Sequence, residues 1–282
     1  MTCKSYWKKF SAETVQALFV AVEDDDRIKA DISLPPVIDM QCSVEGIRDN
    51  YALCLQFWED GFTRQELLQL VKSFQQDPQI AATTRMRYKY IRARYKHLRF
   101  AQHLYGEKHQ SNRLFHTTTV ALGHFQDAYR NGNQRQLEQY GNWLKLLLSK
   151  PVWSWVRFAL RHTRMANEQG FNAYHLEQMR RLQQLVSSPE LTGLQFHNVR
   201  KIISRQVSFY DTLRSIEPGN IQARQISQFL AAINGLMGDR HDVMVADKLA
   251  GGTSYDQPSL LDSDIRQRLE LLLSRSGITA DR

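Results

Sequence analysis

Residues 81–105 have the sequence AATTRMRYKYIRARYKHLRFAQHLY. Apolar and aromatic residues recur every three or four positions, with no proline or glycine among them, which predicts one long α-helix. At about 100° per residue, one face of this helix is apolar and the opposite face carries a narrow basic stripe. The stripe consists of Arg85, Lys89, Arg92, Lys96, Arg99 and His103.

The stripe has almost no partner on its own helix. Nine Lys or Arg residues but one acidic residue lie between Arg85 and Leu114. Like charges at such spacings destabilise a helix unless an anion or an acidic protein surface faces them, so we expect an anion here. A basic face exposed only to solvent is the alternative. Arg87 and Arg94 fall among apolar neighbours, where a guanidinium has to be paired or to line a polar cavity.

The rest of the chain has the same helical character. Only 7 prolines and 14 glycines interrupt 282 residues, and strand signals are nearly absent. Thr63 with Glu66 has the pattern of a capping box, and Pro151 suits a first helical turn. We therefore predict an all-α fold, with a linker at 25–43. The expected helices span residues 6–22, 44–59, 63–76, 81–105, 110–130, 133–148, 151–168, 171–187, 195–216, 221–249 and 259–276.

The net charge changes sign along the chain. Residues 1–80 carry 8 Lys/Arg and 13 Asp/Glu, a balance of −5. Residues 81–215 carry 22 and 7, a balance of +15, and residues 216–282 carry 7 and 9, a balance of −2. An excess of this size indicates a polyanionic partner: nucleic acid, a phosphate polymer or an anionic membrane surface. We expect residues 1–80 to be an acidic N-terminal helical segment that packs near the basic remainder, 81–282.

An internal repeat predicts two similar helical bundles. The segment 86–94 (MRYKYIRAR) recurs in outline as 199–205 (VRKIISR), and each copy is followed by a glycine with an aspartate four residues later. A duplicated pair of long basic helices would give two antiparallel bundles with pseudo-twofold symmetry, at about 81–190 and 195–276. The downstream residues are Gly123 with Asp127 and Gly238 with Asp242.

The second copy resembles the CHAD family, the conserved-histidine α-helical domain. A His-x-x-Arg sequence runs from His197 to Arg200, and Leu-Met-Gly-Asp-Arg-His-Asp follows at 236–242. The first copy fits the same scheme with Arg87 aligned to Arg200 and Thr84 in place of the first histidine. The resemblance covers about residues 81–250. It implies two four-helix bundles with a basic central pore that binds inorganic polyphosphate.

The resemblance and the basic stripe together define the expected polyanion site. The resemblance assigns to the pore the arginines of the first copy and the histidine and arginines of the second. The helix after Pro151 adds three arginines at i, i+4 and i+7, beside Trp153 and Trp155, which we expect to be core or interface anchors. The expected site residues are Arg87, Lys89, Arg92, Arg94, Lys96, Arg99, Arg157, Arg161, Arg164, His197, Arg200, Lys201 and Arg205.

Catalysis, cofactors and metal binding are not expected. No phosphate-cradling glycine loop, His-Glu-x-x-His or Gly-x-Ser-x-Gly occurs, and His241-Asp242 is a weak acid–base pair because adjacent helical residues diverge. The acidic run at 23–26 is expected to be solvated rather than to hold a metal. Three cysteines without zinc-ligand spacing indicate reduced structural thiols. With no apolar run long enough for a membrane span, a cytoplasmic protein is expected.

Two other functions remain open at this stage. The tyrosines at positions 88, 90 and 95 could stack on bases, so a helical protein that binds RNA or DNA is one alternative. A protein-interaction adaptor, with the acidic and basic parts as complementary surfaces, is the other. A non-catalytic polyphosphate-binding protein remains the first hypothesis.

Overall fold

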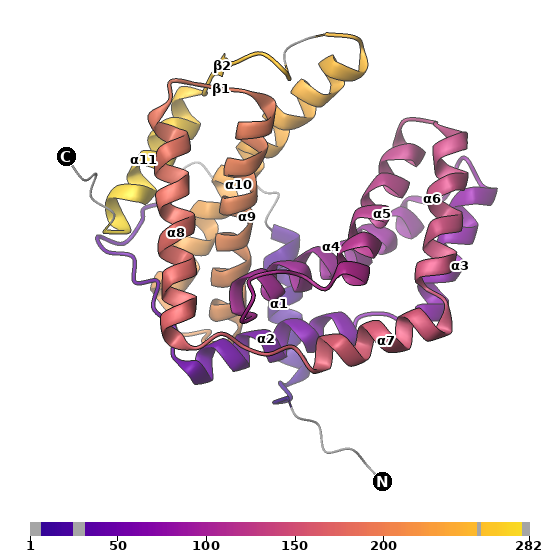
Figure 1. Cartoon of the computed structure of the whole chain (residues 1–282), viewed down its shortest axis with the longest axis horizontal. Coiled ribbons are helices and arrows are strands. Elements are labelled where there is room, and N and C mark those ends of the chain that lie inside the picture. The colour runs from indigo at the N-terminus through magenta and orange to yellow at the C-terminus, as the bar shows by residue number, and fades with distance from the viewer. Residues whose placement is uncertain (1–6, 25–31, 253–254, 278–282) are drawn as a thin grey trace. The chain divides into compact units, whose positions relative to one another are not determined.

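The structure is a computed structural model that describes residues 7–24, 32–252 and 255–277 (Figure 1). Within these residues the fold is all-α, as predicted, and the two strands, β1 (Glu190–Leu191) and β2 (Ser259–Leu260), form a short antiparallel pair. The helices are α1 (Ala12–Asp24), α2 (Val44–Glu59), α3 (Arg64–Gln76), α4 (Ala82–Tyr105), α5 (Arg113–Arg130), α6 (Gln134–Leu147), α7 (Lys150–Arg161), α8 (Glu168–Ser187), α9 (Gly193–Ile216), α10 (Ile221–Leu249) and α11 (Ser263–Arg275).

The chain divides into two compact units. Unit 1 contains helices α2 to α7 and spans residues 7–11 and Glu45–Ala166. Unit 2 contains α1 and α8 to α11 and spans Ala12–Val44 and Asn167–Arg282. This division differs from the boundary at residue 80 that the charge pattern predicts, because α2 and α3 fold with the basic helix α4. Part of the predicted linker, residues 25–31, lies outside the described residues.

Unit 1 has an aromatic core. The indole of Trp58 on α2 lies 5.6 Å, centroid to centroid, from the rings of both Tyr95 on α4 and Phe115 on α5. It also lies 5.1 Å from Trp153 on α7, so the prediction that Trp153 is a core anchor is confirmed. Aromatic pairs of this kind add about 0.5–1.5 kcal/mol each to the burial of their area. Trp155 instead lies on the outer face of α7 and is exposed.

Unit 2 is organised around the antiparallel pair α9–α10. Small and polar side chains fill much of the interface between these two helices, and Ser204 on α9 donates a hydrogen bond to Asn234 on α10 at 2.7 Å. Small residues allow the two backbones to approach closely. The segment that follows residue 31 packs on the same unit, where the amide of Ile38 donates to the carbonyl of Arg275 at 2.9 Å.

The local signals read from the sequence are mostly confirmed. Thr63 caps α3 by accepting from the amide of Glu66 at 3.1 Å, and the Glu66 carboxylate accepts from the amide of Thr63 at 3.4 Å, which completes a capping box. Pro151 lies in the first turn of α7. Cys42 and Cys54 are buried, and burial raises the pKa of the Cys42 thiol to about 12, which disfavours the thiolate form at that position.

Candidate functional site

The two glycines of the repeat each lie against an arginine of the preceding long helix. A Cβ atom placed on Gly123 of α5 would lie 3.2 Å from Nη2 of Arg92 on α4. A Cβ atom placed on Gly238 of α10 would lie 3.0 Å from Nη2 of Arg200 on α9. Any larger residue would crowd the guanidinium, so glycine at these positions lets the arginine lie along the facing helix.

These contacts correct the alignment of the two copies. Gly123 follows Arg92 by 31 residues, and Gly238 follows Arg200 by 38 residues. The residue that corresponds to Arg200 is therefore Arg92, not Arg87 as the sequence alignment predicts. The second copy has seven more residues between arginine and glycine, with ten more in its two helices and three fewer in its loop.

The arginine–glycine contacts also show which neighbouring positions of the two copies correspond. Three residues before each arginine are Lys89 in the first copy and His197 in the second, so Lys89 rather than Thr84 stands at the place of the histidine. Three residues after each glycine are Gln126 and His241. We call Lys89, Arg92, Gly123 and Gln126 the unit 1 seam, and His197, Arg200, Gly238 and His241 the unit 2 seam.

In the unit 1 seam the arginine is held by a neutral partner. Nη1 of Arg92 donates to Oε1 of Gln126 at 2.9 Å, and the Arg92 side chain is half-buried. Lys89 is exposed one turn earlier on α4. Asp127, the residue after Gln126, is exposed on α5. Burial raises the pKa of the Tyr88 hydroxyl, while the charge of Arg92 lowers this pKa and the charge of Asp127 raises it.

The basic stripe continues from this seam along α4. Lys96 is exposed and Arg99 is half-buried, and each cation lies 5.6 Å from the centroid of the Phe100 ring. The predicted orientation of the stripe away from the core is confirmed, since Arg85 is also exposed. His103 is half-buried at the end of the stripe, where its Nδ1 lies 2.8 Å from the carbonyl oxygen of His109.

Arg87 and Arg94 on the opposite face are engaged within unit 1. Nε of Arg87 donates to Oε1 of Glu66 at 2.5 Å, and its Nη2 donates to Oε2 of Glu66 at 3.0 Å and to the carbonyl of Gly61 at 2.9 Å. Arg94 is buried and donates to the carbonyl of Phe57 at 2.8 Å. Burial, with the charge of Arg87 as a second cause, lowers the pKa of Arg94 to about 10. Both were predicted to bind the polyanion; Arg94 is a core residue instead, and Arg87 already has a carboxylate.

The arginines of α7 are also partly neutralised. Nε of Arg161 donates to Oε1 of Glu59 at 2.7 Å, and Nη2 of Arg157 donates to the same oxygen at 3.5 Å. Glu59 belongs to α2, within the acidic segment of residues 1–80. The expectation that this segment packs near basic residues is therefore confirmed for Glu59, as it is for Glu66. Arg164 is exposed beyond the end of α7.

In the unit 2 seam two histidines face each other across α9 and α10. The rings of His197 and His241 are stacked, with centroids 5.1 Å apart and planes 27° apart. The ring of Tyr255 approaches His241 edge-on at 6.1 Å. The pKa of His241 is lowered, first by burial and then by the charge of Arg200, while Asp242 acts in the opposite direction.

The unit 2 seam is the open end of a polar interface that runs into the core. Four residues after Arg200 and four before Gly238 lie Ser204 and Asn234, which are bonded to each other and buried. Seven residues farther along each helix, the Ser227 hydroxyl donates to the fully buried carboxylate of Asp211 at 2.6 Å. Equal steps along both helices therefore fix their register from the buried end to the histidine pair.

The remaining predicted residues of unit 2 lie on either side of this seam. Lys201 is exposed next to Arg200. Arg205 is half-buried and turned toward α8, where its Nη1 donates to the hydroxyl of Tyr174 at 3.0 Å and to Oε1 of Gln178 at 2.8 Å. Arg205 is thus bound to α8 and is not a member of the seam.

Two seam residues, Gln126 and His241, are absent from the predicted site. Their signal in the sequence is the common position three residues after the repeat glycine, on the side of the helix that faces the arginine. The sequence reading compared only the glycine and the aspartate of each copy, and it treated His241 as a partner of Asp242. The contact between His241 and His197 becomes visible only when the register of α9 against α10 is known.

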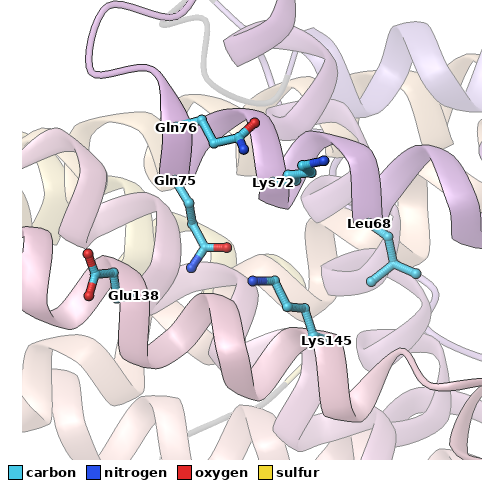
Figure 2. A pocket seen from close by; sticks show the side chains of 6 residues that line it. All are labelled: Leu68, Lys72, Gln75, Gln76, Glu138 and Lys145. Carbon is cyan, nitrogen blue, oxygen red and sulfur yellow. The ribbon is translucent and has the colours of Figure 1, made fainter.

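A shallow cavity of about 460 Å³ lies elsewhere on unit 1, between α3 and α6. Figure 2 shows the two lysines, two glutamines and one glutamate that surround it, together with one leucine. Its charges are of both signs, so the cavity is not a purely cationic site. The lining residues are Leu68, Lys72, Gln75, Gln76, Glu138 and Lys145.

The described residues contain no cluster of three or more His, Cys, Asp or Glu side chains that could hold a metal ion. Of the acidic run at 23–26, residues 25 and 26 lie outside the described residues. None of the described helices is long and apolar enough to cross a membrane. In comparisons with protein-family models, curated proteins and solved structures, no match to the chain was found.

Proposed function

We propose that this chain binds inorganic polyphosphate or a closely related polyanion, without catalysing a reaction, through the cations of the two seams. The observation that carries the proposal is the repeated packing of an arginine against a glycine, Arg92 on Gly123 and Arg200 on Gly238. Membership of a divergent branch of the CHAD family and a cytoplasmic location are parts of the same proposal and stay predictions.

The surroundings of Arg92 suit the reversible binding of an anion. Its partner Gln126 is a neutral amide, whereas Arg87 and Arg161 are bonded to carboxylates. A phosphate oxygen that replaces the amide would exchange a neutral acceptor for an anionic one, so the guanidinium would gain a charge–charge attraction. The half-buried guanidinium is already held in place along α5, so less conformational entropy is lost on binding.

The unit 1 seam and the basic stripe that continues from it can contact several phosphates in succession. Lys89, Arg92, Lys96 and Arg99 follow one face of α4, over a length of about 15 Å at about 1.5 Å per residue. Cations fixed along a line favour a linear polymer of phosphates over a single phosphate ion. The exposed Asp127 offsets part of this charge, and the four cations still outnumber it.

Nucleic acid is the second candidate, and the structure weakens its main support. Tyr88 and Tyr95, two of the three tyrosines expected to stack on bases, are fully buried in the core of unit 1. Tyr90 is half-buried. Without exposed rings among the cations of α4, recognition of phosphates is favoured over recognition of bases, and nucleic acid becomes an outcome of the test below.

The test measures binding of long-chain polyphosphate by the full-length protein at several salt concentrations, with Arg92→Gln combined with Arg200→Gln. Each lost phosphate contact should reduce the slope of log affinity against log salt by about 0.7, so the double variant should lose about 1.4. The matched control is Arg113→Gln with Arg224→Gln. It removes the same charge at exposed positions about 15 Å and about 21 Å along α5 and α10 from the seam glycines.

The outcomes separate the candidates. Equal loss in the seam variant and the control would show that general charge, not the seams, binds the polymer, and would overturn the proposal. Displacement by single-stranded DNA of equal charge as effectively as by polyphosphate would assign the seams to nucleic acid.

A further inference from the structure

The seams of the two units differ in one chemical respect. At the two positions that flank the arginine, unit 1 has Lys89 and Gln126, and unit 2 has His197 and His241. Neither lysine nor glutamine changes its charge between pH 5 and 8, whereas an imidazole gains a proton within this range. The same scaffold therefore carries a constant charge in one unit and a titratable charge in the other.

The histidine pair is packed into a defined position. The stacked rings come from α9 and α10, with centroids 5.1 Å apart. The start of α9 is held by Tyr255, whose carbonyl accepts from the amide of Gly193 at 2.8 Å. The ring of the same tyrosine lies against His241, at 6.1 Å and 75°. Both imidazoles are half-buried, so they remain accessible from solvent on one side.

The charged groups around the pair are of both signs. On α9 they are Arg200, whose charge lowers the pKa of His241, and the exposed Lys201. On α10, Asp242 acts in the opposite direction and is exposed. Beside Tyr255, Lys248 lies 4.6 Å from the ring centroid and is paired with Asp256 at 3.0 Å. Two protonated imidazoles in contact, next to Arg200, would repel one another unless an anion bound beside all three cations.

We propose that the unit 2 seam is a proton-linked phosphate subsite, in which His197 and His241 take up protons as a phosphate group binds beside Arg200, whereas the unit 1 seam binds phosphate without proton uptake. The inference rests on the proposed function, and it adds His241 to the binding residues. A bound phosphate stabilises the imidazolium forms, so by reciprocity protonation strengthens the binding of phosphate. Affinity in unit 2 should therefore rise as the pH falls through the range in which the imidazoles titrate.

The experiment is calorimetric titration of the full-length protein with long-chain polyphosphate at pH 5.5, 6.5, 7.5 and 8.5. Repetition in buffers of different ionisation enthalpy gives the number of protons taken up. Long chains are needed because terminal phosphates themselves titrate near pH 6, and a sulfated polysaccharide of constant charge serves as the second probe. For one proton taken up, affinity should rise by up to about tenfold per pH unit within the titration range.

Reciprocal substitutions provide the matched controls. His197→Lys with His241→Gln gives unit 2 the residues of unit 1, and should abolish proton uptake while binding at pH 8.5 is retained or strengthened. Lys89→His with Gln126→His gives unit 1 the residues of unit 2, and should increase proton uptake above that of the wild type. The second variant changes exposed and half-buried positions of the other unit, so it tests the inference even where the first variant does not fold.

The results distinguish this inference from the proposed function. An absence of polyphosphate binding at every pH would overturn both. Binding with equal affinity and no proton uptake between pH 5.5 and 8.5 would overturn the proton linkage alone. So would proton uptake that persists in the folded variant with His197→Lys and His241→Gln, or that does not increase with Lys89→His and Gln126→His.

Discussion

Arg87 and Glu66 form a two-point ion pair that joins α4 to α3, with Nε–Oε1 at 2.5 Å and Nη2–Oε2 at 3.0 Å. Glu66 also closes the capping box with Thr63. One carboxylate therefore stabilises the start of α3 and neutralises a cation of the basic helix. The balance of +15 counted for residues 81–215 thus overstates the positive charge that an external anion would meet.

The pair makes stability depend on pH at the acidic end. The hydrogen bond from Arg87 is the largest cause that lowers the pKa of Glu66, so this carboxylate contributes stability above the pKa of an unfolded glutamate, about 4.3, which is lost as the pH falls through its folded value. Glu66→Gln keeps the capping-box chemistry and removes the charge. Because both side chains are about one-third exposed, we expect a loss of about 0.5 kcal/mol at pH 7. Urea unfolding should show that the difference from wild type disappears in acid; a constant difference down to pH 2.5 would contradict the assignment.

Glu59→Gln should increase the affinity for polyphosphate. The carboxylate of Glu59 engages both Arg157 and Arg161, and its removal leaves two guanidinium groups with a neutral acceptor. The salt slope should steepen by up to about 1.4 if both then contact phosphate. Because Glu59 is mostly buried, thermal unfolding must accompany the titration. Asp77→Asn, an exposed loop position, is the charge control. An unchanged slope in a folded variant would show that α7 does not reach the polymer.

Alanine at the repeat glycines should separate binding from stability. Alanine has a higher helix propensity than glycine by about 1 kcal/mol, but its Cβ would lie 3.0 to 3.2 Å from the arginine Nη2 atoms. We therefore expect Gly123→Ala and Gly238→Ala to leave the melting temperature within a few degrees of wild type and to weaken polyphosphate binding by shifting the guanidinium. Retained affinity in both variants would mean that the position of the arginine is not important.

Ser227→Ala tests the buried end of the α9–α10 interface. Asp211 is fully buried, and its Oδ1 accepts from Ser227 at 2.6 Å and from Nε of Arg214 at 3.1 Å. Loss of the hydroxyl removes one of these donors from a buried carboxylate, at a cost of about 1–3 kcal/mol. Chemical denaturation should detect this decrease. The nearly isosteric Ser227→Cys, with its weaker donor, should have an intermediate free energy of unfolding. An alanine variant as stable as the wild type would show that this hydrogen bond does not stabilise the interface.

Local patterns in the sequence predicted the helices and their caps well. Thr63 and Glu66 form a capping box because the motif needs only residues three apart. Arg94 could be placed on the inner face of its helix from periodicity, but its hydrogen bond to Phe57 could not, since the partner lies on a different helix. Trp153 and Trp155 were given the same role, although their positions two residues apart put one ring in the core and the other outside.

The domain boundary and the site depended on information that local patterns do not contain. Charge separates residues 1–80 from the rest, yet Trp58 and Phe74 belong to the core of unit 1. We therefore expect deletion of residues 1–80 to destabilise unit 1, because it would remove α2 and α3 from that core. The seam required the pairing of α4 with α5. The arginines were misaligned because the spacing from arginine to glycine differs by seven residues between the two copies.

The connections between the paired helices differ in length, with seven residues between α4 and α5 and four, Glu217 to Asn220, between α9 and α10. The hydrogen bonds that set the axial position of α10 against α9 lie within these helices, at Ser204–Asn234 and Asp211–Ser227, and not in the loop that joins them. An insertion in the loop after α9 would cost mainly closure entropy, about 0.6 kcal/mol for each doubling of its length. A change in the length of this loop should therefore leave the distance from His197 to His241 unchanged. A tag or a reporter domain can be inserted at this turn without moving the seam.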